Sequence, residues 1–309
     1  MSDKQLPNAI YGGQAVIEGV MFAGQKVHVT AVRRKDNTIQ YLEVPKKENP
    51  WLLKLKRIPL VRGLVGIIEA SAKGAQHLNF SAEVFAEEEG APKEEQKETL
   101  ASRLSMILGV AVVGVLSFLF GKFVFTLIPP IIEELLFKNM FESPIGHNLL
   151  EGLIKIILLV GYIYFISLTP MIKRLFQYHG AEHKVISAYE AGLELTVANV
   201  QKFNTLHYRC GSSFIVFTVL IGVVIYSFFQ YDSLTERIIQ RLVLLPLVIG
   251  VSYEVLRFTN SLREVPVLRY LGYPGLWLQL LTTKEPDDAQ VEVSIASFNR
   301  MRELDRQMQ

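Results

Sequence analysis

The chain has 309 residues, of which half are hydrophobic and only 20% are charged. A soluble domain usually carries roughly a quarter charged residues, and the mean hydropathy here is +0.27. The 32 basic and 30 acidic residues nearly cancel, and a single cysteine, Cys210, excludes an intrachain disulfide. This composition excludes a plain cytosolic enzyme, a disordered regulator and a nucleic-acid binder that relies on bulk positive charge. It indicates a multi-pass membrane protein whose main partners are membrane lipids.

Residues 1–50 predict a small cytoplasmic β-unit at the start of a mainly α-helical chain. Three segments show strand-like alternation or many β-branched residues: Ala15–Phe22, Lys26–Arg33 and Ile39–Val44. The glycines around the first segment do not form a GxGxxG pattern that leads into a helix. We therefore reject dinucleotide binding.

Residues 51–81 predict an amphipathic helix at the membrane surface, with Pro59 near its first turn. Glu69 and His77 fall on this helix, and an interfacial position is favoured over a functional role for either residue. Residues 82–100 are acidic and are interrupted by proline and glycine. They predict a solvated linker without chemistry of its own.

Residues 101–260 predict a membrane domain of about four transmembrane helices. A bilayer core of about 30 Å needs roughly 20 mostly apolar residues. Four segments meet or approach this length: Leu104–Ile128, Leu153–Ile172, Ser213–Gln230 and Leu242–Phe258. A buried soluble helix is the alternative for the last one, but four passes return the chain consistently to one side. Residues 173–212 are then a cytoplasmic loop.

Charge sets the predicted orientation, because basic residues gather at alternate ends of the spans. They are Lys93, Lys97, Arg103, Lys173, Arg174, Lys184, Lys202, Arg209, Arg257, Arg263 and Arg269. The intervening loops are acidic and contain Glu133, Glu134, Glu142, Glu151, Asp232 and Glu236. By the positive-inside rule, both termini are cytoplasmic. Residues 261–309 form a cytoplasmic or interfacial C-terminal region.

The segment His179-Gly180-Ala181-Glu182-His183 contains H-x-x-E-H, the reversed form of a zinc-protease helix motif. Histidines four residues apart point the same way on a helix, so both imidazoles can reach one ion. Glu182 is rotated by roughly 100° from His183, which leaves its carboxylate available as the catalytic general base. The alternative is an ordinary cytoplasmic helix with interfacial histidines.

Further candidate ligands lie near the predicted cytoplasmic ends of the other spans. His207 and Cys210 directly precede the third span, and imidazole and thiolate are good zinc ligands. Glu254 lies in the apolar fourth span, where a carboxylate is costly, and Glu190 returns to the histidine face of its helix. The alternatives are a buried hydrophobic role for Cys210 and an ion pair of Glu254 with Arg257. We expect zinc, or another divalent transition metal, at a site drawn from these residues.

Four motifs together resemble the YqhQ-like family of bacterial membrane proteins of unknown function, some of them labelled as predicted metal-dependent enzymes. They are GGQAVIEGVMF (Gly12–Phe22), YHGAEHKVISAYE (Tyr178–Glu190), HYRCGSSF (His207–Phe214) and LTTKEPDDAQVEVSIASF (Leu281–Phe298). The resemblance implies a bacterial inner-membrane protein and agrees with metal ligation by His179, His183, His207 and Cys210. It implies no substrate. It also draws attention to Glu18, which either approaches the site or is a solvent-facing strand residue.

Two hypotheses of different classes follow from the predicted metal site. In the first, the protein is a metal-dependent hydrolase acting on a lipid-linked or membrane-protein substrate, with Glu182 as the base. In the second, four protein ligands close a structural site, and the protein is a membrane scaffold or regulatory partner. Ion or metal transport through Glu254 with Glu133 or Glu134 is a third, less favoured, interpretation. Oligomerisation is left open.

Overall fold

The computed structural model describes residues 11–46, 50–88, 121, 124–208, 210–262 and 265–308. In these residues the protein is mainly helical, with one small antiparallel sheet near the N-terminus. The first predicted span, Leu104–Ile128, therefore lies mostly outside the described residues, as do residues 89–100 of the predicted linker.

The sheet is a four-stranded meander in the order β1-β2-β3-β4. Its strands are β1 (Gly12–Val16), β2 (Gly19–Ala23), β3 (Val27–Arg33) and β4 (Ile39–Pro45). The second and third predicted strands are confirmed, but the first predicted strand, Ala15–Phe22, is in fact a hairpin. Val16 pairs with Gly19, which leaves Ile17 and Glu18 as the turn.

Glu18 has a φ of 52° in this turn, and its side chain reaches the helix beside it. Its carboxylate accepts hydrogen bonds from Arg174, at 2.5 Å from Nε, and from the Tyr178 hydroxyl at 3.2 Å. Glu18 is therefore a turn residue, not a solvent-facing strand residue. Its contacts connect the hairpin to the helix that carries Arg174 and Tyr178.

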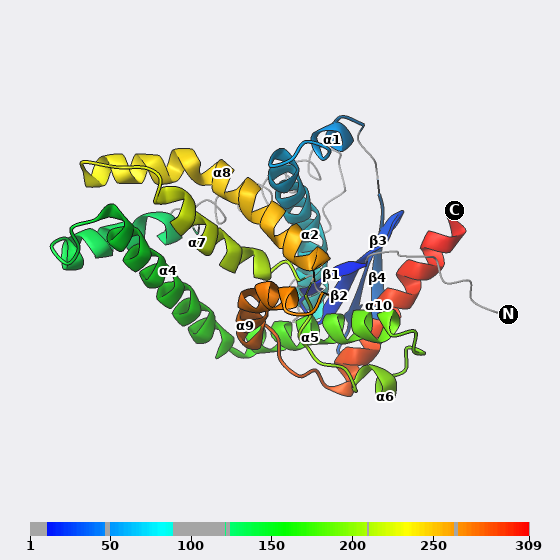
Figure 1. Ribbon diagram of the computed structural model, residues 1–309. Coiled ribbons are helices and arrows are strands. Elements are labelled where there is room, and N and C mark those ends of the chain that lie inside the picture. The colour runs from blue at the N-terminus through cyan, green and yellow to red at the C-terminus, as the bar shows by residue number, and fades with distance from the viewer. Residues whose placement is uncertain are drawn as a thin grey trace, which may run out of the picture.

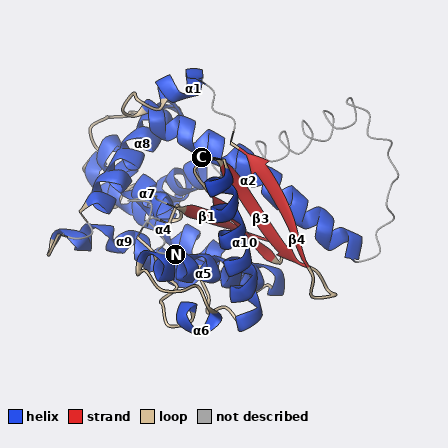
Figure 2. Ribbon diagram, turned by 90° about the vertical axis from the view of Figure 1, so that its right-hand side faces the viewer, coloured by secondary structure: helices blue, strands red, loops and turns tan. Residues whose placement is uncertain are grey.

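Helices α5 (Pro170–Glu190) and α10 (Asp288–Gln307) cover one face of the sheet, as Figures 1 and 2 show. Alternate strand residues point toward these helices, including Phe22, Val29 and Ala31, which are fully buried. Phe298 of α10 packs edge-on against Phe22, with ring centroids 5.0 Å apart. The strand period of two thus builds one hydrophobic core between the N-terminal sheet, the central helix α5 and the C-terminal helix α10.

Helix α2 (Val61–Glu88) contacts the opposite face of the sheet. It follows the short helix α1 (Pro50–Leu55), and it continues past residue 81 into the segment predicted to be a linker. Val84 of α2 packs against Val16 and Val32. Thr30 and the Nδ1 atom of His77 are hydrogen-bonded at 2.6 Å, and the His77 ring lies 6.0 Å from that of His28. His77 is therefore a core residue between helix and sheet.

These two buried histidines give the fold a pH dependence. Burial, with a smaller contribution from the charge of Lys73, lowers the pKa of His77 from 6.5 to about 4. The pKa of His28 is also lowered from 6.5 to about 4, mainly by burial and then by the charges of Lys73, Lys46 and His77. The charge of Glu69 opposes this shift of His28 more weakly. Between pH 6.5 and 4 the unfolded chain binds protons that the folded protein excludes. The contribution of these histidines to the free energy of unfolding is therefore complete above pH 6.5. It decreases as the pH falls toward 4, by about 1.4 kcal/mol per pH unit for each histidine.

We expect His77→Gln to lose about half of this histidine-dependent slope, because glutamine retains a polar partner for Thr30 but does not titrate. Chemical unfolding of both proteins from pH 4 to 7 measures it. Carboxylates that titrate in the same window contribute equally to wild type and variant, so the difference isolates the imidazole. Parallel profiles would contradict the assignment.

Three further apolar helices extend away from the sheet in Figure 1: α4 (Pro144–Ser167), α7 (Ser213–Tyr226) and α8 (Leu234–Ser261). Within the described residues, α4 and α8 are long and apolar enough to cross a membrane by length and composition. Helix α7 has 14 residues, which is shorter than the predicted span Ser213–Gln230. Only 17% of the apolar window of α4 and 28% of that of α8 are buried. Two helices therefore indicate membrane association.

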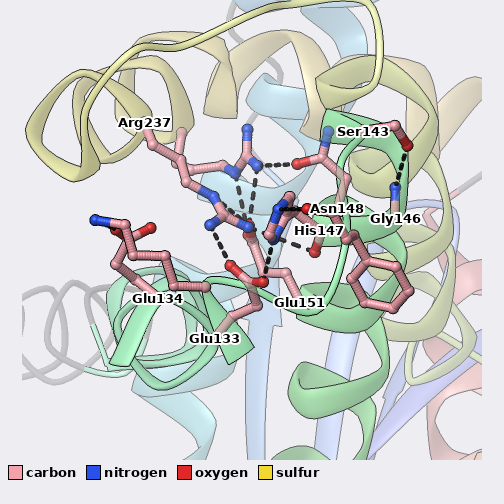
Figure 3. Close-up of polar contacts among 11 residues, drawn as sticks. Glu133, Glu134, Ser143, Gly146, His147, Asn148, Glu151 and Arg237 are labelled. Carbon is pink, nitrogen blue, oxygen red and sulfur yellow. Dashed lines mark hydrogen bonds and ion pairs between the residues drawn. The ribbon is translucent and has the colours of Figure 1, made fainter. Parts of the chain in front are cut away.

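A buried ionic network joins α4 to α8 at the end of the bundle away from the sheet (Figure 3). Arg237 of α8 is fully buried and contacts Glu133 at 2.5 Å and Glu151 at 2.8 Å. Glu133 belongs to a helical stretch at residues 124–137, and its other oxygen lies 2.5 Å from Nδ1 of His147. Arg241 binds Glu151 and Asn148. Two of the glutamates predicted to lie in an acidic loop between spans, Glu133 and Glu151, are thus helical and are buried beside arginine.

Candidate metal centre

Helix α5 carries the H-x-x-E-H motif and begins where α4 ends. Thr169 has an extended backbone and Pro170 occupies the first turn of α5, a position that tolerates the missing N–H of proline. A Cβ on Gly180 would lie 2.2 Å from the carbonyl oxygen of Lys284, so only glycine lets that backbone approach. Gly180 thereby brings the segment after α9 (Tyr273–Thr282) against the two histidines.

Both histidines of the motif have one ring nitrogen held by a backbone carbonyl. Nδ1 of His179 lies 2.8 Å from the Thr282 oxygen, and Nδ1 of His183 lies 2.5 Å from the Thr205 oxygen. A carbonyl only accepts, so each Nδ1 carries the proton and each Nε2 presents a lone pair. Burial lowers the pKa of His183, which favours the neutral ring. The rings are 4.4 Å apart.

Cys210 completes a group of three donors. Its sulfur lies 3.2 Å from Nε2 of His179, and the ligand atoms of His179, His183 and Cys210 all lie within 4.8 Å of one another. The sulfur also accepts a hydrogen bond from the Ser212 backbone N–H at 3.4 Å. Two imidazole nitrogens and a sulfur form a donor set that could hold a metal ion.

Gln279 of α9 positions the loop that carries the cysteine, and it was not among the predicted site residues. Its side chain is fully buried; it accepts from the His207 N–H and donates to the His207 carbonyl, each at 2.9 Å. The sequence contained a signal for this role of Gln279. It is a lone amide side chain in the apolar stretch around Trp277, and such an amide must find hydrogen-bond partners if it is buried. The two carbonyls at Thr205 and Thr282 had no such signal, since any residue supplies one.

Glu182 points from the same helix toward the first strand. Burial raises the pKa of its carboxyl, against opposing effects of His179, His207 and the Gly13 backbone N–H. A Cβ on Gly13 would lie 3.0 Å from the Glu182 side chain, so glycine leaves room for this carboxylate beside β1. Glu182 therefore lies outside the three-donor group of the described residues.

A cavity of about 330 Å³ opens onto these groups. The residues of the predicted site that line it are His179, Glu182, His183, His207 and Cys210. Its remaining wall comes mainly from residues 11–15 of the sheet and from residues 175–176, 186 and 211–212. The three donors and the carboxylate therefore face one shared space.

His207 and Glu190 lie beside the three donors. The rings of His183 and His207 are 5.6 Å apart, and Nε2 of His207 lies 3.8 Å from a carboxylate oxygen of Glu190. The structure thus brings His207 to the same cavity but not into the three-donor group of the described residues.

Glu254 does not join the site, contrary to the prediction. Its two oxygens bind the Arg62 guanidinium, one of them at 2.6 Å from Nε, and accept the Leu60 N–H at 3.2 Å. A carboxylate neutralised by a two-point contact with arginine has a partner of its own. The alternative partner, Arg257, affects Glu254 only as a weaker, more distant charge.

Comparisons with known proteins agree with the four motifs. Residues 58–304 match a family model described as "Protein of unknown function (DUF1385)". The chain is 55% identical over 309 residues to the uncharacterised protein YqhQ of Bacillus subtilis (strain 168), covering 99% of this chain and 96% of that protein. No solved structure matches. The predicted YqhQ-like resemblance is confirmed, and the chain belongs to the DUF1385 family.

Proposed function

We propose that this protein is an inner-membrane, zinc-type metal-dependent hydrolase whose site faces the cytoplasm. The observation that carries the proposal is a group of three protein donors, His179, His183 and Cys210, which shares a cavity with the buried carboxylate of Glu182. Catalytic zinc sites have three protein ligands and one open position, whereas structural sites have four. The described geometry favours the open arrangement over the closed scaffold.

The chain's own residues have distinct roles in this proposal. His179 and His183 would hold the ion through Nε2, because the carbonyls of Thr282 and Thr205 hold their other nitrogens. Glu182 accepts a proton from water in the cavity and returns it to the leaving group. When bound, the metal supplies Lewis acidity and makes water easier to deprotonate. The Glu182 side chain lies against Gly13 of β1, where the absence of a Cβ leaves it room.

The membrane location is supported by α4 and α8, and a lipid-linked or membrane-protein substrate follows from it. Many side chains on α4 are both large and exposed: Ile145, Leu149, Leu153, Ile157, Val160, Tyr162, Tyr164 and Phe165. Such a continuous apolar surface belongs in a bilayer or an interface. With the first and third predicted segments added, the chain makes four passes and has both termini in the cytoplasm.

Glu182→Gln tests the enzyme. We expect it to abolish hydrolysis while the bound metal stays at the wild-type level, because glutamine has the same shape but cannot accept the proton. Purified protein in liposomes of bacterial lipid and membrane-protein extract is analysed for new products by mass spectrometry, with and without a chelator. General-base catalysis accounts for roughly 10²–10⁴-fold in rate.

X-ray absorption of the zinc-loaded protein separates this proposal from the scaffold. Two nitrogens, one sulfur and one solvent oxygen are expected around the ion. A fourth protein ligand, supplied by His207, would leave no open position and would favour the structural role. Loss of zinc in Glu182→Gln would remove Glu182 from the role of base.

A further inference from the structure

A second cavity, of about 340 Å³, lies on the α2 side of the sheet. Among the described residues it shares no lining residue with the metal-site cavity, whose wall is on the α5 side. Its walls come from β3, from the connection between α1 and α2, from α2 itself and from the later part of α8. The titratable residues that line it are His28, Lys56, Arg62, Glu69, Lys73, Tyr253 and Arg257.

Cationic groups outnumber carboxylates around this cavity. Lys56 and Lys73 share the single carboxylate of Glu69, with Lys73 Nζ at 2.6 Å from Oε1. Arg257 makes no ion pair with any residue that the structure describes, and it acts on Glu254 only as a more distant charge. Glu254 itself is held by Arg62. Apart from the Arg62–Glu254 pair, the cavity therefore has three cationic side chains and one carboxylate, that of Glu69. The excess positive charge can attract an anion.

His28 adds an unsatisfied polar group to the same cavity. Its side chain is only 6% exposed, and neither ring nitrogen has a hydrogen-bond partner within the described chain. A buried polar group without a partner is costly, so such groups mark places where a partner is missing. The proton-bearing nitrogen of a neutral imidazole can donate to an anionic oxygen. His28 of the sheet therefore supplies a hydrogen-bond donor to the same cavity that the lysine and arginine side chains line.

The cavity also lies beside an exposed apolar surface. Large hydrophobic side chains of α1, of the turn after it and of α2 are exposed: Trp51, Leu53, Ile58, Leu60 and Ile68. The other wall belongs to α8, one of the two helices long enough to cross a membrane. Apolar side chains next to basic ones are typical of a surface that lies at the level of lipid headgroups.

We propose that this cavity binds a phosphate group through Lys56, Lys73 and Arg257, with His28 donating from the sheet. The phosphate belongs to the headgroup of an anionic lipid or to a free phosphorylated molecule. This site is separate from the metal centre, and it stands whether or not the metal centre is catalytic.

Arg257→Gln is the most informative variant, because no carboxylate in the described part of the chain is ion-paired with Arg257 and would lose its partner. The protein, in a nonionic detergent without phosphate, is titrated by calorimetry with inorganic phosphate and with dihexanoyl phosphatidic acid. We expect Arg257→Gln to weaken binding by about tenfold or more, as a charge-assisted contact is lost. Lys202→Gln, which removes one exposed cation outside the cavity, is the matched control and should bind as wild type does.

A second variant changes the space and leaves the charges in place. A Cβ on Gly66 lies 3.9 Å from the Tyr253 ring, an ordinary contact, so Gly66→Leu can extend a side chain into the cavity. It should also block binding, and it remains informative if Arg257→Gln fails to fold.

Comparison of inorganic phosphate with dihexanoyl phosphatidic acid distinguishes a free phosphorylated ligand from a lipid headgroup. Binding of phosphatidic acid alone, or more tightly than phosphate, identifies a headgroup site; equal or tighter binding of inorganic phosphate identifies a free ligand. The proposal is overturned if wild type binds neither ligand, or if Arg257→Gln and Gly66→Leu bind both as well as Lys202→Gln does.

Discussion

Alanine at position 179, 183 or 210 is expected to strip the metal from the purified protein. Each substitution removes one of the three donors that lie within 4.8 Å of one another. Loss of even an outer-shell partner lowers metal affinity by about 10–100-fold, so loss of a ligand should exceed about 100-fold. Metal content of the dialysed proteins, and competition with a zinc chelator, measure the effect.

His207→Gln decides whether the group has three ligands or four. Since His207 lies outside the three-donor group of the described residues and its Nε2 is 3.8 Å from a Glu190 oxygen, we expect this variant to keep its metal with affinity within about tenfold of wild type. His77→Gln is the control for loss of a buried imidazole elsewhere and should keep the metal unchanged. A metal-free wild type, or equal metal loss in His207→Gln and His183→Ala, would contradict the three-ligand site.

Arg237→Leu is expected to destabilise the helical bundle by about 3–5 kcal/mol, which is the usual cost of removing one partner from a buried ion pair. Leucine leaves the carboxylates of Glu133 and Glu151 without their shared guanidinium, in surroundings where both are nearly inaccessible to water. The contacts are those drawn in Figure 3. Thermal unfolding in detergent measures the loss.

Lys138→Leu is the matched control, because Lys138 forms a salt bridge of 3.1 Å with Glu134 but is 69% exposed. Exposed pairs contribute about 0–1 kcal/mol. Adding Glu133→Gln to Arg237→Leu should recover part of the lost stability, since it removes the charge of Glu133, whereas Glu151 keeps its ion pair with Arg241. Equal unfolding midpoints for Arg237→Leu and Lys138→Leu would show that the network does not hold the bundle together.

In the predicted membrane domain, the local sequence pattern identified the helices but not the contacts between them. Apolar runs located α4, α7 and α8, because a helix needs consecutive apolar residues to lie in lipid or against other helices. The same reasoning assigned Glu133 and Glu151 to an acidic loop between spans. Their burial depends on Arg237 and Arg241 arriving from α8, about 90 to 100 residues along the chain.

The prediction of the β-unit was limited in the same way. The strand period correctly identified β3 and β4, but the first predicted strand is a hairpin that turns at Glu18. Glu18 occupies the turn position with positive φ, where glycine or asparagine would be the usual signal. The conformation is stabilised from outside, by Arg174 and Tyr178 of α5. Turn chemistry alone could not predict it.

The spacing within H-x-x-E-H by itself determined that His179 and His183 share a helix face and that Glu182 points elsewhere, because the helical repeat is a property of the local backbone. Only the tertiary structure decided which distant residues join them. Cys210 arrives because Gln279 holds its loop, and Glu254 is absent because Arg62 binds it. Contacts between distant segments depend on how whole helices pack, and no residue type or spacing along the chain specifies that.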